Sequence, residues 1–163
     1  MANKSRKLEY VYYISVEALP DFKNHFEKFA ELNDVRSRID YRLGLICYGH
    51  GYFDSKSEPN LLKKCTAQPI SVSQLLVDKG IEKVSLLKAD IEGSEFRLPE
   101  DEPELLRKTE RLAMEVHPQY GDATDLVRQL KAFGFKIKLV DKWGRDVKTI
   151  TTPVGFLYAH KEH

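Results

Sequence analysis

Three carboxylates gather where one apolar run of the sequence ends. The mostly apolar residues 84–89 are followed by Asp90, Glu92 and Glu95. A short, nearly continuous apolar run is typical of a strand that is buried on both faces of a parallel sheet. In open α/β sheets, ligands bind beyond the carboxyl ends of the strands. The spacing therefore places three acidic side chains where chemistry is expected.

A second strand pattern ends in a histidine. Residues 111–117 alternate, so Ala113, Glu115 and His117 share one face. Imidazole titrates near neutral pH and can act as a general base, and Asp90 is the alternative base. We predict that Asp90 and His117 lie close together, at the ends of adjacent parallel strands.

The same group has two other interpretations. Carboxylates and imidazole can ligate divalent metals. We nevertheless predict that no metal binds here. If one did bind, the candidate ligands would be Glu92, Glu95 and Glu115. Glu92 and Glu95 can instead cap the helix that follows, where the helix dipole favours acidic side chains. A lone histidine after a strand is also commonly structural.

Hydrophobic periodicity predicts the elements that position these side chains. Strands are expected at residues 10–17, 39–47, 84–90, 111–117, 135–140 and 154–159. Helices are expected at residues 20–32, 70–80 and 122–133, and an irregular helix, broken by prolines, at residues 94–109. Ser71 or Ser73 is expected to cap the second helix.

Bulk composition excludes several classes of function. The 163 residues fit a single domain spanning residues 1–163, and 26 basic against 25 acidic side chains give a net charge of +1. This balance does not indicate a nucleic-acid partner. No apolar run near the start is long enough to span a membrane, so we expect a cytoplasmic protein with no membrane partner. Cys47 and Cys65 have no metal-ligand spacing and are expected as reduced thiols, and His50 is expected in a surface turn.

Residues 87–95, Leu-Lys-Ala-Asp-Ile-Glu-Gly-Ser-Glu, resemble the Leu-Lys-x-Asp-x-Glu-Gly-x-Glu signature of FkbM-type methyltransferases. Residues 111–117 are similar to the next strand of that family, which commonly ends in Glu-x-His, and residues 11–20 resemble its strand ending in Glu and Pro. The resemblance implies an α/β fold: the Rossmann-like class I methyltransferase sheet, mostly parallel, with a C-terminal antiparallel hairpin.

The resemblance also implies a function. S-adenosylmethionine would be the cofactor, Glu17 would bind its ribose hydroxyls, and Asp90 would lie beside the transferring methyl group. The reaction would be O-methylation of a small hydroxylated acceptor such as a sugar, with His117 or Asp90 as the base.

One part of the family pattern is absent from the sequence. Class I methyltransferases begin with a strand that ends in a glycine-rich turn, and no such segment precedes Glu9. We therefore expect a family member lacking its first strand and glycine-rich loop, with weak or no binding of S-adenosylmethionine by the chain alone. The alternatives are a catalytically inactive interaction module, one half of a split enzyme, or a nucleotide- or metal-binding protein.

The absent strand would lie between residues 10–17 and 84–90. We predict that these two strands close up and pair directly. A second copy of the chain, or a split-gene partner, would otherwise supply the missing strand.

Overall fold

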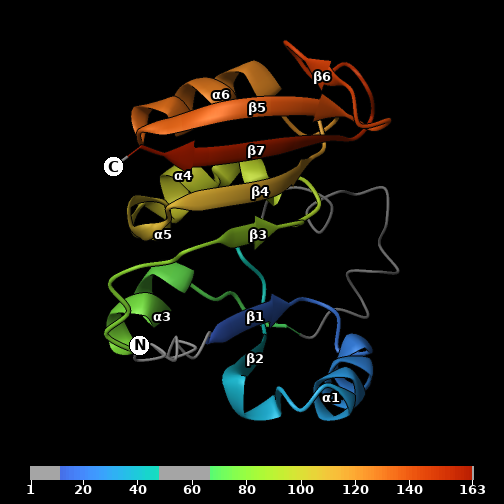
Figure 1. The fold of residues 1–163 in the computed structure, drawn as a ribbon, viewed down its shortest axis with the longest axis vertical. Helices are drawn as coiled ribbons and strands as arrows, with labels where there is room; N and C mark the ends of the chain where they lie inside the picture. Colours follow the sequence, from blue (N-terminus) through green and yellow to red (C-terminus); the bar gives the residue numbers. More distant parts are fainter. Residues whose placement is uncertain (1–11, 48–66, 163) are drawn as a thin grey trace, which may run out of the picture. The chain divides into compact units, whose positions relative to one another are not determined.

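The computed structural model describes residues 12–47 and 67–162, which belong to two compact units (Figure 1). Of the described residues, 12–45 and 67–68 belong to the first unit, and 46–47 and 69–162 belong to the second. The single domain expected from the sequence stays a prediction.

The first unit contains a two-stranded parallel sheet. Its elements are β1 (Tyr13–Glu17), α1 (Phe22–Leu32), the 3-10 helix η1 (Arg36–Arg38) and β2 (Ile39–Leu43). Tyr13 is paired with Ile39 and Glu17 with Leu43 in parallel, so the two strands predicted in this part of the sequence are confirmed. On α1 the apolar stripe is only partly covered within the described residues: Ala30 is buried, while Phe22 and Phe29 are exposed.

The second unit is built on a five-stranded sheet. Its strands are β3 (Leu87–Ala89), β4 (Arg111–Val116), β5 (Phe135–Asp141), β6 (Asp146–Val147) and β7 (Gly155–Lys161), in the order β3-β4-β7-β5-β6 (Figure 1). Only β3 and β4 pair in parallel. The expectation of a mostly parallel sheet is therefore wrong here, because β7 enters between β4 and β5 and runs opposite to both. The predicted C-terminal antiparallel hairpin is confirmed.

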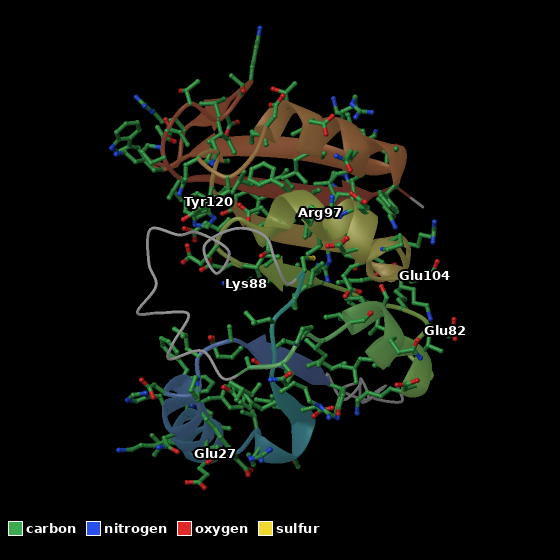
Figure 2. All side chains as sticks on the ribbon, turned by 180° about the vertical axis from the view of Figure 1, so that it is seen from behind. Glu27, Glu82, Lys88, Arg97, Glu104 and Tyr120 are labelled. Atoms are coloured by element: carbon green, nitrogen blue, oxygen red, sulfur yellow. The ribbon has the colours of Figure 1, made fainter. Side chains whose placement is uncertain are left out.

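Helices cover one face of this sheet. The described helices of the unit are α3 (Val72–Asp78), the 3-10 helix η3 (Ser94–Arg97), α4 (Leu98–Asp101), α5 (Pro103–Lys108) and α6 (Ala123–Ala132). Helices α4, α5 and α6 lie behind the strands in Figure 1 and in front of them in Figure 2. The core contains Leu112, Met114 and Leu157 from the sheet and Leu98, Leu106, Leu126 and Leu130 from the helices. The irregular helix expected at residues 94–109 is confirmed as three short segments.

Strand β3 differs from the expectation in its burial. It is not buried on both faces: Ala89 is buried, but Lys88 is exposed and the preceding Leu86 is 56% exposed. Among the described residues β3 pairs with β4, and β1 with β2. Because β1 and β3 belong to different units, their predicted direct pairing stays a prediction.

Gly121 lies in the connection between β4 and α6, where it is in close contact with Phe96. A Cβ at position 121 would lie 2.4 Å from Cγ of the Phe96 ring. We expect Gly121→Ala to lower the free energy of unfolding by about 1–3 kcal/mol, because the ring would have to move. Urea denaturation measures this effect. Phe96→Leu should recover part of the loss in the double variant, and a Gly121→Ala protein as stable as the wild type would contradict the contact.

Candidate functional site

The carboxyl ends of β3 and β4 bring three predicted site residues together. Asp90 follows β3, Glu115 is in β4 and His117 follows β4. One ligand atom of each lies within 4.8 Å of the others. The predicted proximity of Asp90 and His117 is therefore confirmed, and it follows from the parallel register in which Ala89 is paired with Met114.

A buried carboxylate fixes the imidazole of His117. Glu95 is fully buried, and its Oε1 accepts hydrogen bonds from the His117 backbone N–H at 2.7 Å and from Nδ1 at 3.1 Å. Its Oε2 accepts from the Gly93 amide at 2.7 Å. Gly93 and Glu92 both have positive φ, 97° and 51°, and this turn directs the following η3 so that Glu95 points inward. With Nδ1 bound to Glu95, Nε2 faces the other carboxylates.

The electrostatics of the site are those of one imidazole among several acids. Nε2 of His117 lies 3.4 Å from Oε2 of Glu92 and 3.6 Å from Oε1 of Glu115. The hydrogen bond to Glu95 raises the pKa of His117; burial opposes this shift, and the charges of Glu95, Glu92 and Glu115 add to it. Burial raises the pKa of Glu92, against the effect of His117, and the neighbouring acids raise it further.

The ring of Tyr120 lies beside this group, with its centroid 6.5 Å from that of His117 (Figure 2). The backbone N–H of Tyr120 donates a hydrogen bond to the His117 carbonyl at 3.0 Å. This bond closes a turn after the end of β4. Tyr120 is not among the residues predicted for the site from the sequence. The signal was available in the Pro118 that follows His117, since a proline there indicates a turn.

Glu17 stands at the carboxyl end of β1, in the first unit. It is half-buried, and its Oε1 accepts a hydrogen bond from the Leu19 amide at 2.9 Å. Its role at a ribose stays a prediction, as do the catalytic roles of Asp90 and His117.

Two of the residues considered in the sequence, His50 and Cys65, lie outside the described residues. Cys47 is a buried free thiol, and burial raises its pKa to about 12. No helix in residues 12–47 and 67–162 is long and apolar enough to cross a membrane.

Comparisons with known proteins define the class of fold. No family model matches the sequence, and no curated protein matches it. A solved structure titled METTL16 MTase domain (crystal form 2) is similar, with a TM-score of 0.55, 10% sequence identity, and coverage of 93% of this chain and 50% of that chain. The chain therefore has an α/β fold that resembles a class I methyltransferase domain, and it spans half the length of that structure. At this identity the likeness concerns the fold alone.

Proposed function

We propose that the chain is a methyltransferase of the FkbM type that uses S-adenosylmethionine to methylate a hydroxyl group of a small molecule such as a sugar. Two observations support this proposal: the methyltransferase-like fold, and the pair of Glu95 and His117 beside Asp90 and Glu115 at the carboxyl ends of β3 and β4. The second observation carries it, because an oriented imidazole next to carboxylates is what removal of a hydroxyl proton requires.

The residues present are compatible with the cofactor in part. Oε1 of Glu17 is held by the Leu19 amide, so the carboxylate has a fixed position and a second oxygen that can accept from a ribose hydroxyl. When bound, S-adenosylmethionine supplies the electrophilic methyl group.

His117 is the proposed base. Glu95 holds Nδ1 as a donor, so the neutral imidazole presents the lone pair of Nε2 and can take the hydroxyl proton as the oxygen attacks. Glu95 then stabilises the imidazolium that forms. Asp90, which is exposed, positions the acceptor hydroxyl or replaces His117 as the base.

Transfer of a labelled methyl group from S-adenosylmethionine to a panel of sugars and other small alcohols tests the proposal. We expect Asp90→Asn and His117→Ala each to lower the rate roughly a hundredfold. Glu82→Gln is the matched control, since it removes an exposed carboxylate that pairs with Lys108, outside the site. Near-normal turnover in both site variants would assign Asp90 and His117 to structure.

Calorimetry with S-adenosylmethionine distinguishes the active chain from its alternatives. Micromolar affinity that is lost in Glu17→Ala would support a chain active by itself. Weak affinity that rises on addition of a second protein, or with self-association, would support a split enzyme or a dimer. Absence of binding and of transfer in every case would reject the enzyme and favour an interaction module.

A further inference from the structure

Within the part of the chain that the structure describes, the acidic group at the ends of β3 and β4 carries more negative charge than its partners balance. Asp90, Glu92 and Glu115 have no lysine or arginine within ion-pair distance among residues 12–47 and 67–162, and His117 is the one cationic side chain near them. Several other acidic side chains of the unit pair with basic ones, as Glu110 does with Lys83 at 2.7 Å. Like charges at short range repel, so this arrangement favours a bound cation.

The distances around Nε2 of His117 are compatible with a set of metal ligands. The side chain is 5% exposed, and the separations of 3.4 Å and 3.6 Å from Nε2 to carboxylate oxygens are longer than normal hydrogen bonds, about 2.7–3.2 Å. Ligands about 2.1 Å from one ion lie about 3.0 Å apart in neighbouring positions and about 4.2 Å apart in opposite ones. Nε2 therefore faces oxygens at the spacing that ligands around one ion have.

We propose that Asp90, Glu115 and His117 form a binding site for a divalent cation of the manganese class. The ligand atoms lie within 4.8 Å of one another, so small side-chain rotations bring them onto one ion. Glu92, half-exposed beside Nε2, is placed as an additional oxygen ligand. Two carboxylates with one imidazole suit Mn²⁺ better than Ca²⁺, which prefers oxygen alone, or structural Zn²⁺, which prefers sulfur and imidazole.

Glu95 supports the site from behind and is not one of its ligands. Both of its oxygens are engaged, by Gly93 and by His117. A carboxylate on the far nitrogen of an imidazole is the usual support of a metal-binding histidine, because it fixes the tautomer and the orientation of the ring. This assignment changes the candidate set from the sequence, since Asp90 and His117 join Glu115 as ligands and Glu95 leaves the set.

The cation would change how a hydroxyl is activated at this site. A metal-bound hydroxyl has a lowered pKa, so proton removal would depend on the cation and not on Nε2 as the base. This last step rests on the proposed methyl transfer, whereas the binding site does not.

Titration of the chelator-treated full chain with Mn²⁺ tests the site, with calorimetry for stoichiometry and electron paramagnetic resonance for the free ion. We expect one ion per chain, bound at least about tenfold more weakly in Asp90→Asn and in Glu115→Gln. Both changes are made at side chains that are not fully buried, and circular dichroism checks that each variant folds. Glu82→Gln and Glu104→Gln remove carboxylates outside the cluster and should leave the affinity unchanged (Figure 2).

Absence of Mn²⁺ binding up to about 1 mM, or equal affinity in wild type and both site variants, would overturn the proposal. The outcome is independent of catalysis. Mn²⁺ binding through Asp90 and Glu115 without methyl transfer would support the cation site and reject the proposed function. Methyl transfer without Mn²⁺ binding would support the proposed function and reject the cation site.

Discussion

Replacing Glu95 by alanine is expected to lower the free energy of unfolding by about 3–5 kcal/mol. Glu95 is fully buried and accepts three hydrogen bonds, from the Gly93 amide, the His117 amide and Nδ1 of His117. Alanine would leave two backbone N–H groups and one imidazole nitrogen without an acceptor in a buried place. These groups would be removed from water without forming a hydrogen bond in the protein, which explains the size of the effect.

Urea denaturation followed by circular dichroism measures this loss. Glu92→Gln is the matched control, since it changes an acidic side chain three residues away that is half-exposed, and it should change the free energy of unfolding by about 0.5 kcal/mol or less. Equal stability of Glu95→Ala and wild type would show that water replaces the carboxylate and that the site is not rigidly built.

The same carboxylate contributes to the pH dependence of stability through His117. The hydrogen bond to Glu95 raises the folded-state pKa of His117 above its ordinary value of 6.5. The stabilisation from this group is therefore fully present below pH 6.5 and is lost as the pH rises through the folded-state pKa. In Glu95→Gln the pKa of His117 should fall and this pH dependence should flatten. An NMR titration of His117 in both proteins gives the answer, and an unchanged pKa would contradict the role of Glu95.

The sequence predicted those parts of the site that depend on local pattern. The alternation of residues 111–117 was enough to place His117 at the end of a strand, and the apolar run before Asp90 was enough to place a second strand end. Their proximity then follows from parallel pairing, which the structure shows for β3 and β4. Ser71 was also correctly predicted as a helix cap, since its Oγ accepts from the Gln74 amide at 3.2 Å.

The parts that failed depend on features that the hydrophobic pattern does not encode. The antiparallel character of the second sheet arises because β7, near the end of the chain, enters between β4 and β5, and no local pattern specifies that position. The direction of the Glu95 side chain depends on the positive φ of Glu92 and Gly93. Of these two residues, only glycine readily adopts a positive φ. The inward direction of the Glu95 side chain toward His117 was therefore not predictable from the spacing of the residues.

The other large effect is expected at Glu102, which sequence reasoning did not single out. This carboxylate is 2% exposed and accepts hydrogen bonds from the Val72 amide at 2.9 Å and the Ser73 amide at 2.6 Å, at the start of α3. In return, Oγ of Ser73 accepts from the Leu105 amide, in the first turn of α5, at 3.1 Å. Glu102 therefore joins two helices through groups that no intrahelical bond would satisfy.

We expect Glu102→Ala to lower the free energy of unfolding by about 2–4 kcal/mol, because the buried Val72 amide and the half-buried Ser73 amide lose a charged acceptor. Ser71→Ala is the comparison at the same helix start. It removes the cap on the Gln74 amide and a 3.4 Å hydrogen bond to Glu102 but leaves both amide bonds to Glu102, so it should lower the free energy of unfolding by about 1 kcal/mol. Hydrogen exchange of the Val72 and Ser73 amides should quicken in Glu102→Ala before the sheet is affected, since α3 would open locally. A loss no larger than that of Ser71→Ala, with unchanged exchange, would mean that solvent reaches these amides and that the two helices are joined by their apolar contacts alone.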